Sequence, residues 1–468
     1  DGEFIELYNK GNSPIDLSAW AFTEGIDYNF PGGTVIPAND YLVIAANPEI
    51  TSAAFPKAKV IGPYLGNLAN NGEFIRLVDQ WGNTVDKLHY HTGGDWPRLA
   101  AGGGSSLELR HPDMDNSDPS AWADSDESNK SSWQSFNISE QYQQLTTRGS
   151  SSDYEELHIH AVGDAHIALR NVSLTRNTSS TNILPGGGET VSRSGTGSNG
   201  WLCQGTHHAS DKFGNEFHII SSGHGDNKAN RCEIDVTQIS RNDNLKFTCQ
   251  ARWISGKPTL VLNTWDRSFG GVLHLELPSN LGSAGASNTS LISSPAPTVS
   301  GLVHSPAVPT SSDPVLITAK VNSSSLISSV NVYHRRSTSS GNENYQTTPM
   351  NDLGRDGDEL AGDGIYSATL NQYQSDNTIV QFYVRAASGN STSFSPGPAP
   401  ELPALWVVDN SNIPTDLRTQ RFVISEYDRN SLNANTGGGS SRDYDFPRLS
   451  NQYFNSTFIS NEKHIIYN

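Results

Sequence analysis

The chain has 468 residues and a formal net charge of −18, from 31 Lys and Arg against 49 Asp and Glu. This acidic balance disfavours nucleic acid as a partner, because its phosphates would be repelled, and suits cation binding or solubility. No stretch approaches the roughly 18 apolar residues of a membrane span. The 42 glycines and a charged fraction of only 17% favour strands and turns over helices. A chain of this length is expected to hold several domains.

The first predicted unit, residues 1–136, consists of short strands separated by Gly, Pro and Asn turns, with a hairpin turn at Trp81-Gly82-Asn83. Four stretches follow one another in this order: FIELYNKGNSPIDLSAW, FPGGTVIPANDYLVIAANPE, LGNLANNGEFIRLVDQWGNTVDKLHY and DWPRLAAGGGSSLELRHPDMDN. They resemble successive motifs of the lamin-tail domain, which has an immunoglobulin-like fold. In that family another strand precedes the one at Phe4, and this sequence lacks it. The resemblance therefore implies an open sheet edge, to be filled by upstream chain or by a neighbouring molecule.

The second predicted unit, residues 137–292, contains LHIHAVGDAHIALRNVSL, whose alternation predicts two strands around a turn at Gly163-Asp164. LKFTCQARWISGKPTLVLNTW and GVLHLELPSNLGSAGASN continue this pattern. The unit resembles a galactose-binding-like jelly roll of the carbohydrate-binding type. Its aromatic residues either stack on a sugar or belong to the core, and they are Tyr154, Trp201, Trp253 and Trp265.

A Pro/Ser-rich connector leads into residues 293–408, where VLITAKVN, SSVNVYHRR, GIYSATL and TIVQFYVRAAS predict four strands. They are arranged as in immunoglobulin or fibronectin-type modules, which space other domains. The last segment, residues 409–468, resembles the opening of the spore-coat-protein-H kinase-like domain through TQRFVISEYDRNSL and FNSTFISNEKHIIYN. It ends before the phosphate- and metal-binding residues of that family, so no catalytic residue is assigned. The expected fold class is all-β, a multidomain tandem of β-sandwiches.

One loop, NDLGRDGDELAGDG, concentrates acidic residues among glycines. Asp352, Asp356, Asp358 and Asp363 offer the hard oxygen ligands that Ca²⁺ takes, on a backbone that glycine makes permissive. Their spacing is not that of an EF-hand. The alternative is an Asp/Gly turn whose carboxylates accept hydrogen bonds from their own backbone. The turn is the more common role of such a loop; if the loop binds a metal, Ca²⁺ is the expected one.

Two further residue classes bear on the compartment. Cys203, Cys232 and Cys249 allow one disulfide and one free thiol, in three alternative pairings. In a secreted chain, Asn-x-Ser/Thr triplets would carry covalent glycans on solvent-facing loops. The eight triplets begin at Asn129, Asn137, Asn171, Asn177, Asn288, Asn322, Asn390 and Asn455.

Several histidines invite comparison with a zinc site, but neither HExxH nor a paired CxxC is present, so polar or ligand-lining roles are favoured. With Cys232, the residues concerned are His158, His160, His207, His208, His218 and His224. The sequence also has no GxSxG nucleophile elbow.

These features predict an extracellular or cell-surface structural protein without catalytic activity. The leading hypothesis is a subunit of a glycosylated surface fibre that polymerises head to tail with copies of itself by strand complementation. The accepting groove would be lined by Phe4, Ile5 and Leu7, and the donated residues would be Phe458, Ile459, Ile465 and Ile466. One alternative is the non-catalytic front part of a secreted kinase-like protein. Another is a monomeric carbohydrate-binding adhesin.

Overall fold

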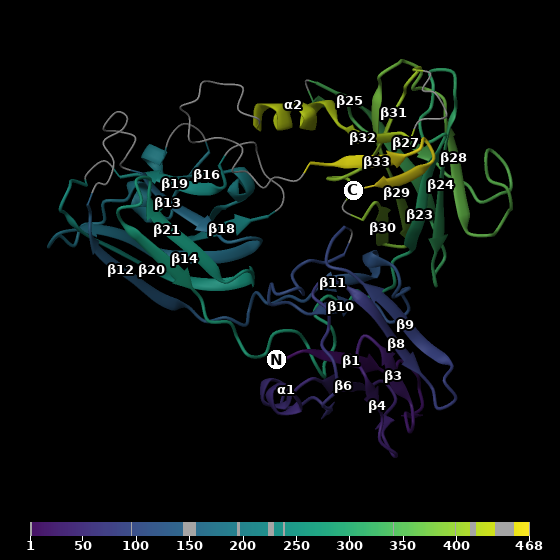
Figure 1. Ribbon diagram of the computed structural model, residues 1–468, viewed down its shortest axis with the longest axis horizontal. Coiled ribbons are helices and arrows are strands. Elements are labelled where there is room, and N and C mark those ends of the chain that lie inside the picture. Colours follow the sequence, from purple (N-terminus) through teal and green to yellow (C-terminus); the bar gives the residue numbers. More distant parts are fainter. Residues whose placement is uncertain are drawn as a thin grey trace.

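The architecture was analysed in a computed structural model, which describes residues 2–94, 96–143, 156–193, 197–222, 229–236, 239–339, 341–397, 399–411, 418–435 and 454–467. Figure 1 shows three β modules at the corners of a triangle, with the C-terminal strands beside the third. The predicted all-β tandem is confirmed. Neither α-helix of the described residues, α1 (Pro48–Ala54) or α2 (Glu426–Asn435), has the length and apolar character needed to cross a membrane.

The first module, residues 2–92, is a small sandwich. Its sheets have the orders β1-β6-β7 and β4-β3-β8-β9, and β2 pairs with β5. Strand β6 forms the centre, because Leu42 and Ile44 are fully buried. The predicted hairpin joins β8 to β9, and Asp79 Oδ1 accepts from the N–H groups of Trp81 and Asn83. The strands are β1 (Phe4–Tyr8), β2 (Ile15–Asp16), β3 (Ala21–Glu24), β4 (Tyr28–Asn29), β5 (Val35–Ile36), β6 (Tyr41–Ala45), β7 (Val60–Ile61), β8 (Glu73–Val78) and β9 (Thr84–Tyr90).

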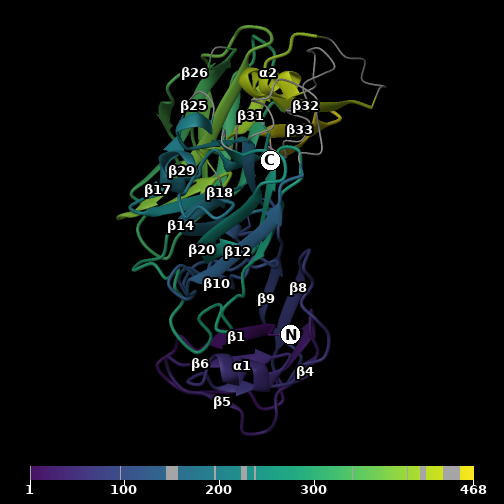
Figure 2. The same cartoon turned by 90° about the vertical axis from the view of Figure 1, so that its left-hand side faces the viewer.

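Residues 93–131 form a junction rather than the end of the first sandwich, so the first unit is shorter than predicted. Its two strands, β10 (Leu107–Leu109) and β11 (Trp122–Asp124), pair only with each other. Figure 2 shows the junction strand β10 above the first module and below the sheet of the second. The contact with the second module is close, since a Cβ on Gly104 (φ +88°) would lie 2.6 Å from Trp253 Cζ2. Arg98 adds an ion pair to Asp164 at 3.1 Å.

The second module is a sandwich of a five-stranded sheet, β12-β20-β14-β18-β17, and a six-stranded sheet, β15-β16-β19-β13-β21-β22. The strands predicted around Gly163-Asp164 exist, but β13 and β14 belong to opposite sheets and do not form a hairpin. The strands are β12 (Gln134–Gln141), β13 (Glu156–Ala161), β14 (Ala165–Arg176), β15 (Val191–Ser192), β16 (Trp201–Gln204), β17 (Asp211–Phe213), β18 (Glu216–Ser221), β19 (Arg231–Asp235), β20 (Asn244–Gly256), β21 (Thr259–Thr264) and β22 (Gly270–His274).

The third module contains the four strands predicted for it, in two facing sheets. One has the order β23-β24-β28; the other has the order β26-β25-β29-β30, extended by β27 on β25 and by β31 on β29. Their shared core includes Val332, Phe382 and Trp406. The strands are β23 (Thr298–Ser305), β24 (Val315–Asn322), β25 (Ser329–Thr338), β26 (Gly341–Asn342), β27 (Gln346–Pro349), β28 (Ile365–Leu370), β29 (Ile379–Ser388), β30 (Ser391–Ser395) and β31 (Ala404–Val407).

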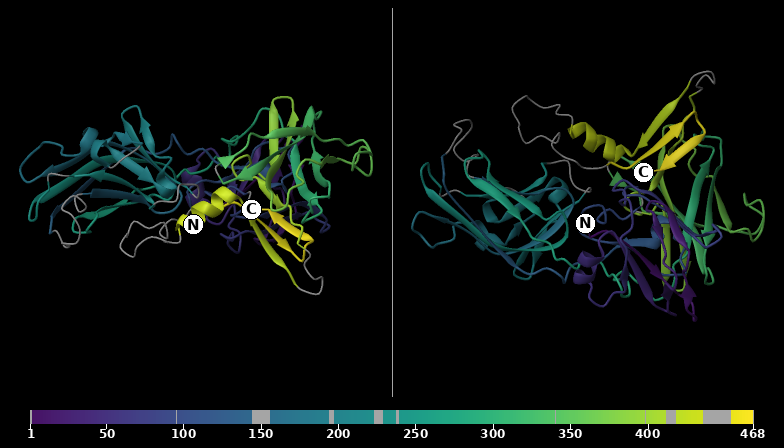
Figure 3. Two further views of the ribbon diagram at one scale, coloured as in Figure 1. Left: turned by 90° about the horizontal axis from the view of Figure 1, so that it is seen from above. Right: turned by 60° about the horizontal axis from the view of Figure 1, so that its bottom comes forward.

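The C-terminal segment folds onto the third module. Strands β32 (Gln420–Ile424), β33 (Ser456–Ser460) and β34 (His464–Tyr467) form one antiparallel sheet. Its inner face buries Val423 and Ile459 against Leu405. Figure 3 shows this sheet lying against the green strands of the third module in both views.

Candidate functional site

Strand β1 has one free edge. It pairs with β6 on one side, and among the described residues no strand pairs with the other side. Ala46 N–H donates to Glu3 O and Asn9 N–H donates to Asp40 O, so alternate residues of the strand turn their backbone groups to β6. The N–H and C=O groups of Phe4, Glu6 and Tyr8 therefore point to the free edge.

This edge faces a cavity of about 1280 Å³, here called the β1 groove. Its apolar lining comes from β1 itself, from β9, from β10 and from the segment that follows the second module. The lining side chains include Ile5, Leu7, Leu88, Leu107, Leu109 and Leu291. The predicted groove residues Phe4, Ile5 and Leu7 are therefore brought together at one cavity. Ile5 and Leu7 also pack against the core of the first module, whereas Phe4 meets the ring of Phe55 edge-on.

A return strap, residues 282–292, closes one side of the groove. The strap leaves the second module and is fixed on β10 by Glu108, which is only 3% exposed. Its carboxylate accepts from the hydroxyls of Ser283 and Thr289 and from the N–H of Ser290. At the start of the strap, Glu127 Oε1 accepts from Gly282 N–H at 2.9 Å. Two buried carboxylates thus hold the strap across the junction.

Glu6 connects β1 to the strap. Its Oε2 accepts a hydrogen bond from Gly285 N–H. Burial raises the pKa of Glu6 to about 7; the bond from Gly285 opposes this shift and nearby Glu108 adds to it. The groove therefore holds a carboxyl group that titrates near neutral pH.

The predicted donor residues are not free. Phe458 and Ile459 lie in β33, and Ile465 and Ile466 lie in β34, all paired within their own chain. Ile459 is fully buried, so the prediction that these strands are available for donation is wrong for β33. Ile466 is 62% exposed, and the second edge of β34 has no partner strand among the described residues.

The glycosylation triplets divide by exposure. Six of the eight asparagines are exposed, as glycan attachment requires: Asn129, Asn137, Asn171, Asn177, Asn322 and Asn390. Asn288 is half-buried and donates to Leu109 O at 2.8 Å. Asn455 is only 7% exposed and its Nδ2 donates to Pro403 O, so this position contradicts the expectation of a solvent-facing loop.

The second module shows which cysteines pair and whether two of the tryptophans belong to the core or could stack on a sugar. Cys203 and Cys232 form the disulfide between β16 and β19. Cys249 is a buried free thiol, and burial raises its pKa to about 12. Trp201 and Trp253 are fully buried in the core, so they cannot stack on a sugar. Tyr154 lies outside the described residues.

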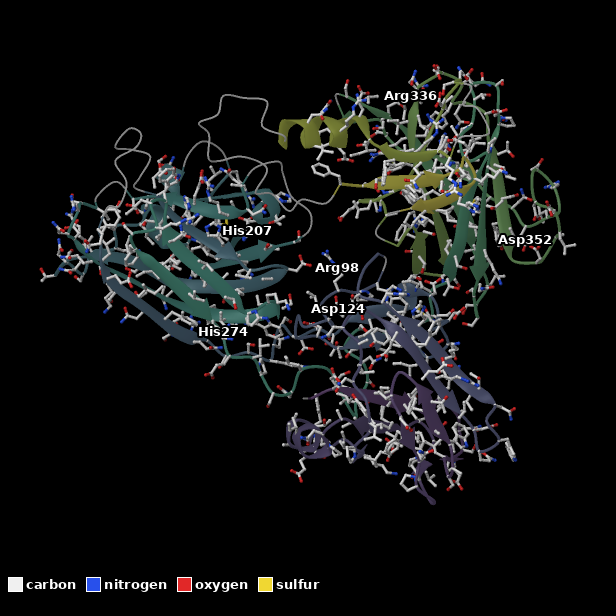
Figure 4. All side chains as sticks on the ribbon, viewed as in Figure 1. Arg98, Asp124, His207, His274, Arg336 and Asp352 are labelled. Carbon is white, nitrogen blue, oxygen red and sulfur yellow. A yellow bond between two sulfur atoms is a disulfide. The ribbon has the colours of Figure 1, made fainter. Side chains whose placement is uncertain are left out.

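The histidine-rich region does not form a zinc cluster with Cys232, whose sulfur is in the disulfide. His158 lies beside Glu156 and Glu233, with side-chain ligand atoms within 4.8 Å of one another. Arg231 Nε contacts Glu233 at 2.6 Å, and this positive charge disfavours a metal at the same position. Figure 4 shows His207 inside the second module; His224 lies outside the described residues.

Sequence reasoning missed two arrangements. One is the pair of carboxylates that hold the return strap, Glu108 and Glu127. They do not stand out in the sequence, because it contains 49 Asp and Glu residues. The other is on the second module, where the guanidinium groups of Arg170 and Arg252 both lie over the ring of Trp133. The Cζ atoms of Arg170 and Arg252 are 4.1 and 5.1 Å from the centroid of that ring. The spacing of these residues along the chain gives no signal, because the strands that bring them together are far apart in sequence.

Comparison with known families identifies the module that carries the groove. Residues 1–92 match the Lamin Tail Domain. The assignment made from the motifs is thus confirmed for this lamin-tail module, and the junction lies beyond it. No similar sequence was found among curated proteins. One similar crystal structure is that of a protein from Corynebacterium diphtheriae described as a putative membrane anchored protein. The alignment covers 64% of this chain and 56% of that protein's chain, with 11% sequence identity and a TM-score of 0.15. This chain thus spans just over half of that protein's length. At this TM-score the similarity supports no conclusion about fold or function.

Proposed function

We propose that this protein is a structural subunit of an extracellular fibre, and that its lamin-tail module accepts a β-strand from another copy at the β1 groove. One observation carries the proposal: a strand edge with free backbone groups faces a cavity that is lined in part by apolar side chains. Proteins usually cover such an edge, because it is a template for pairing with another chain. Strand addition satisfies the backbone groups by hydrogen bonds and fills the pockets with side chains.

The donor is β34 of the second copy. Because β34 is an edge strand, it can pair with β1 of a neighbour without leaving its own sheet. An apolar row crosses the outward face of the C-terminal sheet: Ile466 of β34 lies beside Phe458 of β33, and Phe458 lies beside Phe422 of β32, with ring centroids 5.0 Å apart. A contact between different surfaces of identical subunits is heterologous, so it repeats into an open filament.

Two features support an extracellular location. The Cys203–Cys232 disulfide is typical of oxidising compartments. Six exposed Asn-x-Ser/Thr triplets would be accessible to glycosylation. The adhesin alternative loses Trp201 and Trp253 as a binding platform, because both are fully buried.

The fibre is tested by comparing Glu6→Pro with Glu6→Ala in the full chain. Both variants lose the bond to Gly285, but only proline also loses the N–H that faces the groove, and proline is tolerated at such an edge position. We expect Glu6→Ala to form filaments and Glu6→Pro to stay monomeric, as seen by negative-stain electron microscopy and sedimentation.

Filaments formed equally well by both variants would contradict strand pairing at β1. Thermal unfolding of both variants checks that the first module is intact in each. Intact-mass measurement of native material discriminates the enzyme alternative, which requires a longer chain with a catalytic domain.

A further inference from the structure

We propose that the loop between β27 and β28 of the third module binds one Ca²⁺ ion through Asp352, Asp358 and Asp363. Carboxylate oxygens of these three residues lie within 4.8 Å of one another. Oxygens on opposite sides of a bound Ca²⁺ are about 4.6–5.2 Å apart, so one ion can contact all three. The loop lies at the outer side of the third module, where Figure 4 labels Asp352.

The backbone of the loop fixes the three carboxylates. Asp352 accepts from Gly362 N–H at 2.6 Å and from Gly364 N–H at 3.1 Å, which ties the two ends of the loop together. Asp358 Oδ2 accepts from Gly354 N–H. Asp363 Oδ1 accepts from Ile365 N–H at 2.8 Å, at the first residue of β28. The turn interpretation of the sequence thus accounts for both oxygens of Asp352 and for one oxygen each of Asp358 and Asp363. It does not account for Asp358 Oδ1.

An unpartnered oxygen points to a ligand. Asp358 is only 7% exposed, and its Oδ1 has no hydrogen-bond partner among the described residues. A buried carboxylate oxygen without a partner is costly, because it has given up water and gained nothing in exchange.

The charge of the site also calls for a cation. In the part of the chain that the structure describes, no Lys or Arg forms an ion pair with Asp352, Asp358 or Asp363. The basic residue of the loop, Arg355, is instead beside Asp356 at 3.8 Å. Three neighbouring carboxylates repel one another unless a positive charge lies between them.

Asp356 does not belong to the site, although the sequence suggested it. Its side chain is 75% exposed, and it is not among the carboxylates whose oxygens lie within 4.8 Å of one another. The predicted set of four is therefore corrected to three. Hard oxygen ligands on a glycine-rich loop favour Ca²⁺ over Mg²⁺, which requires near-ideal octahedral geometry. Extracellular modules that bind Ca²⁺ do so with a Kd of about 0.1–1 mM.

The test uses the full chain, freed of metal by a chelator, and follows thermal unfolding and calorimetric binding as CaCl₂ is added. We expect saturable binding of one ion, and a rise of about 10 °C in one unfolding transition when calcium is a hundred times its Kd. Asp358→Asn and Asp363→Asn should each weaken binding about tenfold or more, because each removes one ligand charge. Asp363 is exposed and its asparagine keeps the bond to Ile365, so this variant is expected to fold.

Asp356→Asn is the matched control, since it makes the same change in the same loop at a position where asparagine tolerates φ > 0. It should bind calcium as the parent does. The proposal is overturned if calcium changes neither heat nor melting temperature, or if Asp356→Asn weakens binding as much as Asp363→Asn. The loop includes neither β1 nor β34, so a failure of calcium binding is separate from a failure of the fibre.

Discussion

Glu108→Ala is expected to lower the free energy of unfolding by about 3–4 kcal/mol, because it leaves three donors of the return strap without their charged acceptor. Glu108 is buried and receives bonds from Ser283, Thr289 and Ser290. The strap should then detach from β10. Chemical denaturation measures the loss, and limited proteolysis within 282–292 measures the detachment.

Two controls make this result specific. Thr289→Val removes one of the three donors and should cost about 1 kcal/mol. Glu49→Ala, on helix α1, removes an exposed carboxylate and should cost less than about 0.5 kcal/mol. If Glu108→Ala were no more harmful than Glu49→Ala, the strap would be held by other contacts.

Acidification is expected to loosen the C-terminal sheet through His304. This residue is 1% exposed; its Nδ1 lies 2.6 Å from the hydroxyl of Tyr467 and its Nε2 lies 2.9 Å from Ala307 O. Burial lowers the pKa of His304 to about 4. In the unfolded chain a histidine titrates near 6.5, so the unfolded state binds more protons between pH 6.5 and pH 4. Stability is therefore lost as the pH falls through that range, by about 3 kcal/mol at most.

Hydrogen exchange of residues 456–467 at pH 7 and at pH 5 measures this effect. His304→Gln removes the titrating group, so its exchange should change less with pH than that of the parent. His274→Gln makes the same change at an exposed histidine of the second module, labelled in Figure 4, and should behave as the parent does. Equal pH dependence in the parent and in His304→Gln would assign the acid response to other groups.

Alternation predicted individual strands well because it reports which side chains of a strand are buried. FIELY became β1 and VLITAKVN became β24. The same signal cannot say which sheet a strand joins. The stretches on both sides of Gly163 therefore suggested a hairpin, although the chain crosses there from one sheet to the other.

The candidate sites were predicted in part for a related reason. The sequence named Phe4, Ile5 and Leu7, and it named the three aspartates that converge in the third module. It could not exclude Asp356, because the direction of a loop side chain depends on backbone angles that neighbouring contacts set. Nor could it find Glu108, whose place between Leu107 and Leu109 indicates a solvent-facing residue. The strap that covers it comes from about 180 residues later in the chain.

The return strap gives the chain an unusual path for mechanical load. The second module begins just after Lys130 and ends just before Gly282, and the Lys130 ammonium contacts Gly282 O directly. A pull between the first and third modules is therefore carried across the strap and β10, and the second module stays outside the line of tension. If the strap gave way, roughly 150 residues would come under load, with a reach of about 400 Å once unfolded, because the Cys203–Cys232 disulfide keeps the residues between the two cysteines from extending. The return strap would then detach first under load, and the extension of the second module would limit the force on the first and third modules.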